Sequence, residues 1–190
     1  RLPGFFEQYP DIRVEVRLND RVVDLVEEGL DLALRMGKLP DSTLVAKYLC
    51  ASPWVTVATP RYLKKHGVPQ HPREIKDHVC AVYTDSARFH DLLYVDGGEP
   101  LIVRIDGPFH TNSSEGLRAA IRADLGIAMT PKWLVGDLLA SGELVSLLES
   151  FHGEPSDVNA VYPSGRHLPS KVRCFMDYFT EQYDCCDMIC

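Results

Sequence analysis

The sequence predicts an α/β protein, because strand-like and helix-like segments alternate along its 190 residues. Hydrophobic residues make up 45% of the chain and charged residues 25%, which is typical of a globular protein and argues against a disordered or collagen-like chain. The sequence contains no internal repeats and no low-complexity tracts. A chain of this length can bury a substantial core, either as one large domain or as two small ones.

The first part of the chain is predicted to run strand, helix, strand. Residues 12–18 alternate apolar and polar side chains, which predicts a strand with one buried face. Asp20 can cap a helix that ends near Gly29 and whose apolar residues are Val22, Leu25 and Val26. The short apolar run 32–36 predicts a strand that is covered on both faces.

The middle of the chain is predicted to be mainly strands. These strands cover residues 44–49, 54–58, 79–83, 92–95 and 101–105. Asp96, Gly97 and Gly98 predict a hairpin turn between the last two strands. Thr59 followed by Pro60 predicts the start of a helix, and residues 71–78 predict another short one.

A helix is predicted to begin at the segment Asn112-Ser113-Ser114-Glu115, which resembles a capping box, and to end at Gly126. Arg118 and Arg122 are expected to face outward, whereas the inward residues are expected to be Leu117, Ala120, Ile121 and Ala123.

The last third of the chain predicts two strands, at residues 127–129 and 159–162, each followed by a helix. Thr130 and Pro131 are expected to start the first of these helices, whose apolar residues are Trp133, Leu134 and Leu138. The C-terminal helix has apolar side chains at helical spacing, namely Val172, Phe175, Met176 and Phe179.

Charge and hydropathy narrow the class of protein. The 20 Lys and Arg residues against 27 Asp and Glu residues give a net charge of −7, and no segment is a basic run. Because cationic groups that displace phosphate counterions supply most nucleic-acid affinity, we expect this chain alone to bind DNA poorly. No apolar run approaches the roughly 18 residues of a membrane-spanning helix, and residues 1–7 contain no signal-peptide core. The prediction is a soluble, cytoplasmic chain.

No catalytic residue and no cofactor are predicted. The serine-hydrolase elbow, the phosphate loop, the zinc-protease helix and the dinucleotide glycine motif are all missing from the sequence. A short helix would bring together His71, Glu74 and His78, but their polar context favours a solvated surface over a zinc site.

The six cysteines fall into two groups. Three lie in apolar stretches and are expected to be small buried side chains, namely Cys50, Cys80 and Cys174. The others, Cys185, Cys186 and Cys190, lie in an acidic tail, where a thiolate metal site is conceivable but no histidine or paired spacing completes four ligands.

Two features suggest recognition of a ligand. Arg35 lies inside an apolar strand, where an unpaired charge is costly, so it serves either a bound ligand or a structural ion pair with a core carboxylate. Residues 111–114 form a polar helix start, which is either an anion site or an ordinary helix cap.

Seven segments in order make the chain resemble the effector-binding domain of LysR-type transcriptional regulators over essentially its whole length. The most specific is the loop Arg35-Met36-Gly37-Lys38-Leu39-Pro40-Asp41-Ser42. The segments are residues 5–12, 24–37, 39–46, 58–63, 112–120, 123–128 and 161–169.

The resemblance implies a type 2 periplasmic-binding-protein fold, in which two Rossmann-like α/β subdomains are joined by two crossover strands. Subdomain 1 would comprise residues 1–51 and 163–190, and subdomain 2 would be residues 52–162, inserted into the first. The family's first strand is missing from this sequence. No DNA-binding helix-turn-helix precedes Arg1 either, so we expect a fragment of a longer regulator.

On the family's template, an effector would bind in the cleft between the subdomains. One wall would be made by Arg35, Met36, Gly37, Asp41 and Ser42, and the other by Thr111, Asn112, Ser113, Thr130 and Pro131. Apolar wall would come from Met36, Leu39, Trp54 and Met129. Two helix starts and an arginine favour a small anion, most simply a carboxylate on an apolar or aromatic body.

The resemblance therefore predicts an inducer-sensing domain that is not an enzyme. It implies an antiparallel homodimer of this domain, through residues 1–8 and the helix 115–124, and a tetramer of the full-length regulator. DNA would be bound only through the missing helix-turn-helix. The alternative is a free solute-binding protein, or a related enzyme, on the same fold.

Overall fold

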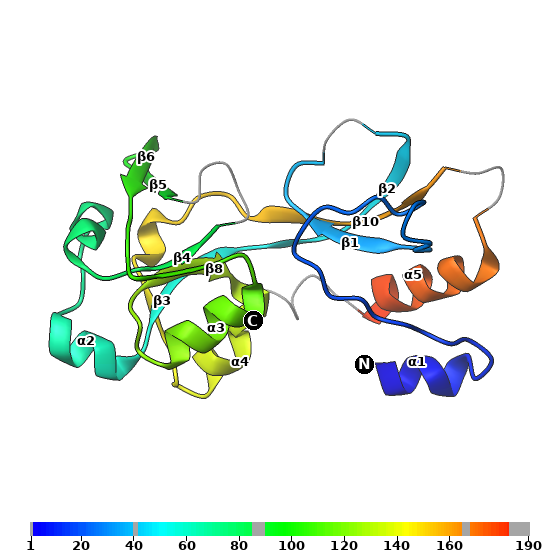
Figure 1. The fold of residues 1–190 in the computed structure, drawn as a ribbon, viewed down its shortest axis with the longest axis horizontal. Helices are drawn as coiled ribbons and strands as arrows, with labels where there is room; N and C mark the ends of the chain where they lie inside the picture. The colour runs from blue at the N-terminus through cyan, green and yellow to red at the C-terminus, as the bar shows by residue number, and fades with distance from the viewer. Residues whose placement is uncertain (1, 40–41, 85–89, 165–167, 183–190) are drawn as a thin grey trace. The chain divides into compact units, whose positions relative to one another are not determined.

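A computed structural model of the chain describes residues 2–39, 42–84, 90–164 and 168–182 (Figure 1). The chain folds into two compact units. Unit 1 contains residues 1–51 together with the segment that begins at residue 156, and unit 2 contains residues 52–155. Both units combine a β-sheet with helices, so the predicted α/β class is confirmed.

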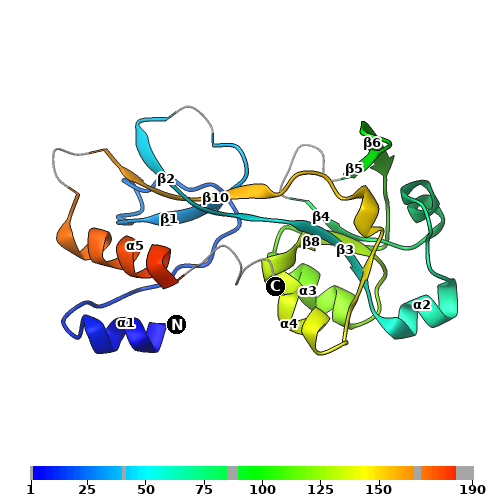
Figure 2. The same ribbon diagram turned by 180° about the vertical axis from the view of Figure 1, so that it is seen from behind.

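Unit 1 is a three-stranded sheet with two helices. Its strand order is β1-β10-β2, with β1 (Ala33–Met36), β10 (Ser156–Pro163) and β2 (Leu44–Ser52). β1 runs antiparallel to β10, with Arg35 opposite Asn159. The two helices lie side by side (Figure 2) and are α1 (Leu2–Gln8) and α5 (Ser170–Gln182).

Aromatic packing joins the two helices of unit 1. Phe5 of α1 is completely buried, and its ring centroid lies 5.3 to 6.0 Å from three aromatic rings of α5, those of Phe175, Tyr178 and Phe179. The apolar spacing predicted for the C-terminal helix is confirmed: Val172 and Met176 are buried and pack with Ala160 of β10.

The predicted strand at residues 12–18 is wrong, because this segment has no regular secondary structure. Val16 is 62% exposed and Leu18 is 87% exposed. Period-two alternation yields a strand only where a neighbouring strand supplies hydrogen bonds. No strand in the described part of the chain pairs with residues 12–18.

The predicted helix after Asp20 is also wrong. Residues 25–29 form only a turn, in which the Asp24 carboxylate accepts hydrogen bonds from the amides of Val26 and Glu27. Of the apolar residues expected on one helix face, Leu25 alone is buried, and Val22 and Val26 are about 70% exposed. A helix this short needs tertiary packing for its stability, and these exposed side chains do not supply it.

The strand predicted at residues 32–36 is present as β1, but it is not covered on both faces. Leu34 is 63% exposed. An antiparallel sheet commonly leaves one face to solvent, and β1 pairs antiparallel with β10.

Unit 2 contains a longer sheet. Its strands are β3 (Trp54–Ala58), β4 (Ala81–Tyr83), β7 (Phe109–Thr111), β8 (Ala128–Pro131) and β9 (Val145–Leu147). β3 pairs antiparallel with both β8 and β9, and β4 pairs parallel with β7. Backbone hydrogen bonds of Ile127 with Val79 and Ala81 join the strand pair β7-β4 to the three strands β8-β3-β9. The order of strands in the sheet is therefore β7-β4-β8-β3-β9.

Apolar side chains cover both faces of this sheet. Val55 and Val57 face one core together with α3 (Ser114–Arg122) and α4 (Lys132–Ala140), which lie on the same side of the sheet (Figure 1). Ala58 faces a second core, which includes residues of α2 (Pro60–His66) and η1 (Pro72–Asp77).

The expected start of α2 and the expected hairpin are confirmed. Thr59 is the N-cap of α2, and its hydroxyl accepts a hydrogen bond from the amide of Tyr62. β5 (Asp91–Asp96) and β6 (Glu99–Arg104) pair antiparallel through the turn Gly97–Gly98, where both φ angles are positive as a two-residue hairpin turn requires. Residues 72–77 form a 3₁₀ helix capped by His71.

Helix α3 begins and ends differently from the prediction. Its N-cap is Ser113, whose hydroxyl accepts a hydrogen bond from the Gly116 amide, so Asn112 does not start a capping box. The helix ends before Gly126, at Arg122, and Asp124 two residues later has a left-handed φ of +60°. Aspartate tolerates this conformation, and its carboxylate is bound by the hydroxyl of Thr59 and the guanidinium of Arg61.

Two side chains expected to face inward lie at the surface. Ala123 is exposed because it follows the end of α3. Trp133 of α4 is 48% exposed, whereas Leu134 and Leu138 are buried as predicted.

The remaining predictions concern cysteines, metals and membranes. Cys50 and Cys80 are buried as expected, and Cys174 is partly buried. Cys185, Cys186 and Cys190 lie outside the described residues. Within the described ranges, no three His, Cys, Asp or Glu side chains are arranged to hold a metal ion. This includes the three side chains in and beside η1, namely His71, Glu74 and His78. None of the helices in these ranges combines the length and apolar character needed to span a bilayer.

Candidate functional site

The sheet of unit 2 collects the predicted site residues of this unit at one edge. β7, β4 and β8 are parallel, so their carboxyl ends meet there, at Thr111, Tyr83 and Pro131. β3 is antiparallel to β8, and its first residue, Trp54, pairs with Pro131 at the same edge. Carboxyl ends of strands are where open α/β sheets bind ligands.

Two helices start at this edge. Ser113 caps α3 and follows directly on β7, and Thr111 accepts a hydrogen bond of 3.1 Å from the Ser113 amide through its hydroxyl. Asn112, between them, is exposed. Pro131 is the N-cap of α4, and no side chain caps that helix. The positive ends of both helix dipoles therefore lie at the same edge of the sheet.

Thr130 contributes a buried hydroxyl without a partner. The residue is 1% exposed, and its Oγ1 makes no hydrogen bond within the described residues. It lies opposite Val55 and shares a sheet face with Ala128, on the side covered by α3 and α4. Because buried polar groups are nearly always bonded, this hydroxyl is a candidate ligand contact.

An ion pair fixes the two helices to each other. The Arg118 guanidinium of α3 donates to both carboxylate oxygens of Asp137 on α4, at 2.7 and 2.6 Å, and also to the Leu134 carbonyl. This arginine lowers the pKa of Asp137 to about 2. Bidentate pairs of this kind set orientation as well as energy. The two helix starts are therefore held in a fixed relation.

Sequence reasoning missed three residues of this edge. Tyr83 is the last residue of β4, which lies between β7 and β8, and Thr84 follows it and donates its amide to the Thr111 carbonyl at 2.7 Å. Ser52 is the second buried hydroxyl without a hydrogen bond within the described residues. The strand at 79–83 was predicted, but its position between the two groups of site residues follows only from the order of strands.

Unit 1 positions Arg35 at the centre of its predicted site residues. Its guanidinium donates to the carbonyl of Val23 at 2.7 Å and makes no ion pair with a carboxylate of the described residues. Among the described residues, Arg35 therefore has no carboxylate partner of the kind that the structural alternative requires. One hydrogen bond leaves most of the five donors of an arginine available for a ligand.

The neighbours of Arg35 lie at the end of β1. Met36 and Leu39 are partly buried, and Ser42 is exposed. Gly37 has a φ of +87° and donates its amide to the Asp157 carbonyl at 2.8 Å, so the chain turns sharply here. Asp41 lies outside the described residues.

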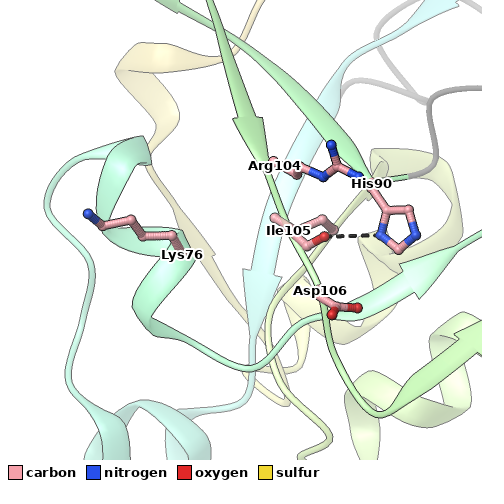
Figure 3. A pocket seen from close by; sticks show the side chains of 5 residues that line it. All are labelled: Lys76, His90, Arg104, Ile105 and Asp106. Atoms are coloured by element: carbon pink, nitrogen blue, oxygen red, sulfur yellow. Dashed lines mark hydrogen bonds between the residues drawn. The ribbon is translucent and has the colours of Figure 1, made fainter.

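A surface pocket of about 470 Å³ opens elsewhere on unit 2 (Figure 3). None of the predicted site residues lines it; its lining residues are Lys76, His90, Arg104, Ile105 and Asp106. The His90 ring is bound to the Ile105 carbonyl at 3.1 Å. A hydrogen bond from the amide of Gly107 is the main cause that lowers the pKa of Asp106, so the pocket lining combines a carboxylate with the cations Lys76 and Arg104. This mixture of charges favours a single anion less than the sheet edge does.

The groups at this sheet edge are of kinds that bind ligands. The edge offers helix dipoles, hydroxyl groups and an indole ring. The predicted site residues that the structure describes include neither a pair of carboxylates nor a nucleophile beside a base. This set can hold an anionic group and an apolar body, and it offers no proton shuttle.

Comparison with known proteins identifies the relatives of this chain. The family model for the LysR substrate binding domain matches residues 1–184. An uncharacterized HTH-type transcriptional regulator of Haemophilus influenzae is 33% identical over 90% of this chain and 59% of its own length. The HTH-type transcriptional regulator CrgA of Neisseria meningitidis is 34% identical over 94% of this chain and 60% of its own length. The chain thus spans about 60% of these relatives.

Solved structures give the same result. The regulatory domain of CrgA, a LysR-type transcriptional regulator from Neisseria meningitidis, has a TM-score of 0.87 and 32% identity, over 95% of this chain and 89% of that one. The full-length Vibrio cholerae virulence activator AphB has a TM-score of 0.79 and 28% identity, over 95% of this chain and 62% of that one. The fold class of the chain is type 2 periplasmic-binding-protein-like.

Proposed function

The chain belongs to the LysR substrate-binding domain family, and from this premise we propose that it senses a small anionic effector for a transcriptional regulator. The coarse function, the effector-binding domain of a LysR-type regulator, follows from the family. The class of effector, its site and the assembly are the proposal. The comparisons do not favour the alternative of a free solute-binding protein or enzyme, since the relatives are regulators.

One observation carries the choice of an anion. Two helix N-termini, those of α3 and α4, begin at the same edge of one sheet, and α4 has no side-chain cap. Helix N-termini attract anions through their free amides and their dipoles. The partnerless hydroxyl of Thr130 in the adjoining core supports a ligand here, because a bound carboxylate would accept its hydrogen bond.

We further propose that unit 1 supplies a cation to the same effector. Arg35 has donors to spare, and planar guanidinium groups match carboxylates in bidentate geometry. Met36, Gly37, Leu39, Asp41 and Ser42 would complete this part of the site. In unit 2, Trp54 and Met129 would contact the apolar body of the effector, beside Thr111, Asn112, Ser113, Thr130 and Pro131.

Action of the whole protein is proposed from its relatives. Since the chain spans about 60% of them and they are HTH-type regulators, DNA would be bound by a part outside this chain. We propose that the domain itself is not an enzyme, acts in the cytoplasm and forms an antiparallel homodimer through α1 and the segment 115–124, with a tetramer for the full-length regulator. Effector binding would shift the balance between two conformations.

A thermal-shift screen of small carboxylates on the 190-residue chain tests the proposal, with the uncharged primary amide of each acid as its control. A true effector raises Tm, and its amide does not. Calorimetry then compares the wild type with Arg35→Ala, where we expect roughly ten- to a hundredfold weaker binding. Arg13→Ala, an exposed arginine of unit 1, serves as the matched control. Equal affinity of wild type and Arg35→Ala contradicts the proposed role of Arg35.

A further inference from the structure

His152 ties three elements of unit 2 together. It follows η2 (Glu149–Phe151), and its backbone forms an antiparallel bridge with Tyr94 of β5. Its ring also reaches the central strand β3, where the backbone amide of Thr56 donates to Nε2 at 3.1 Å. β9 ends at Leu147, which lies opposite Thr56, so the His152 ring binds β3 at the last residue that β9 covers.

The hydrogen bonds around Nε2 form a directed chain. The Thr56 hydroxyl lies 3.2 Å from Nε2 and 2.9 Å from the hydroxyl of Tyr94. Burial raises the pKa of Tyr94 to about 12, so its phenol stays protonated. Tyr94 can therefore donate to the Thr56 hydroxyl, and the single lone pair of Nε2 is bound by the Thr56 amide. Because Nε2 accepts from the Thr56 amide, the neutral ring carries its proton on Nδ1.

A proton on Nε2 breaks this arrangement at one point. The Thr56 hydroxyl can rotate and accept from the new N–H, since a hydroxyl both donates and accepts. The backbone amide of Thr56 cannot reverse, so two N–H groups would face each other. A buried amide that loses its acceptor is costly in free energy.

The charged and polar groups around the ring act in opposite directions. Burial lowers the pKa of His152 below its ordinary value of 6.5, whereas the carboxylate of Glu149 and the Leu147 carbonyl raise it. Burial is the largest of these effects. Since the pKa in the folded state is lowered, the stability from the neutral ring is fully present above pH 6.5 and is lost as the pH falls through the lower pKa of the folded state.

We propose that His152 is a pH-sensitive latch, whose protonation breaks the hydrogen bond that ties the residue after η2 to the central strand at Thr56. The latch is next to the proposed effector site, because Thr56 pairs with Met129 of β8. Release would loosen the strand pair that carries Met129 and Thr130. This last step rests on the proposed function, but the latch itself does not.

Amide exchange measured by NMR on the unliganded 190-residue chain tests the latch. After correction for intrinsic exchange, the protection of the Thr56 amide is expected to fall by about threefold or more between pH 7 and pH 5. The His152 ring signals are expected to titrate below pH 6.5. Unchanged protection of Thr56, or a ring that titrates at or above pH 6.5, overturns the proposal. No effector is needed, so failure here leaves the proposed function standing.

A pair of variants separates the latch from general acid sensitivity. His152→Gln keeps an acceptor for the Thr56 amide that does not titrate in this range, so Thr56 protection is expected to become independent of pH. His66→Gln, at an exposed position on α2, is the control and is expected to keep the wild-type dependence. If both variants keep the wild-type dependence, the latch is wrong. If His152→Gln does not fold, the wild-type titration alone decides.

Discussion

Replacing Thr130 by valine should stabilise the protein, although the residue is completely buried. The two side chains have nearly the same shape, and the exchange removes a hydroxyl that makes no hydrogen bond within the described residues. Most substitutions at buried positions destabilise a protein, so an increase in stability is a stringent expectation.

The size of the effect follows from the state of the hydroxyl. A buried hydroxyl without a partner costs about 1–3 kcal/mol in mutational data. We expect Thr130→Val to raise the free energy of unfolding by about 1 kcal/mol, the lower end of that range. In a chain of this length, this raises Tm by about 2–4 °C.

Thr56→Val is the matched control in the same sheet. Thr56 is also completely buried, but its hydroxyl is bonded to Tyr94 and lies within hydrogen-bond distance of His152. The same exchange there should lower stability by about 1–3 kcal/mol. Urea unfolding at pH 7 compares both variants with the wild type. If Thr130→Val destabilises as much as Thr56→Val, the Thr130 hydroxyl has a partner and its role as a free ligand contact is refuted.

Four further predictions concern packing, pH, assembly and DNA binding. Phe5→Ala should destabilise unit 1 by about 3–5 kcal/mol in urea unfolding, because its buried ring contacts Phe175 and Tyr178, and a loss below 1 kcal/mol would contradict this packing. Arg118 lowers the pKa of Asp137 from 3.8 to about 2, so the stability from this pair is fully present above pH 3.8 and is lost as the pH falls towards 2. Asp137→Asn should therefore flatten Tm between pH 4 and pH 2, and an unchanged slope would show that the pair does not contribute there. Light scattering should give a dimeric mass, and a gel shift at low salt should show no DNA binding; a strictly monomeric mass at high micromolar concentration, or a shift with a steep salt dependence, would refute the respective expectation.

The sequence predicts unit 2 well because its elements carry local signals. Thr59 caps α2, the Gly97–Gly98 turn closes the hairpin, and the buried strands β3 and β8 are short apolar runs. Each of these local structures depends on only a few neighbouring residues of the sequence. The exceptions are the end of α3, where Asp124 takes a left-handed conformation that Thr59 and Arg61 support, and the strands β7 and β9, which are not predicted from the sequence.

Unit 1 is predicted less well because its first third depends on tertiary partners. Residues 12–18 have the alternation of a strand, but no described strand pairs with them. The turn at 25–29 buries Leu25 alone, and Leu34 of β1 faces solvent. Periodicity reports which side chains share a face, and it does not report whether anything covers that face.

The candidate site was predictable only in part. Local sequence predicts the helix starts only to within one residue, at Asn112 where the N-cap is Ser113 and at Thr130 where the N-cap is Pro131, and it predicts the polar strand residue Arg35. The position of Tyr83 between β7 and β8 needs the order of strands. The missing partner of Thr130 needs the packing of a complete core. Neither has a signal in the sequence.

The most direct test of effector binding at the two helix starts is an amide NMR titration of the chain. The ligand is the small carboxylate that gives the largest thermal shift, added to uniformly labelled protein at pH 7. We predict that the largest shifts occur in the first turns of α3 and α4, at residues 114–116 and 132–134, and that Ser113→Ala reduces them. If the largest shifts occur instead at residues 104–106, in the pocket of Figure 3, the proposed effector site is wrong.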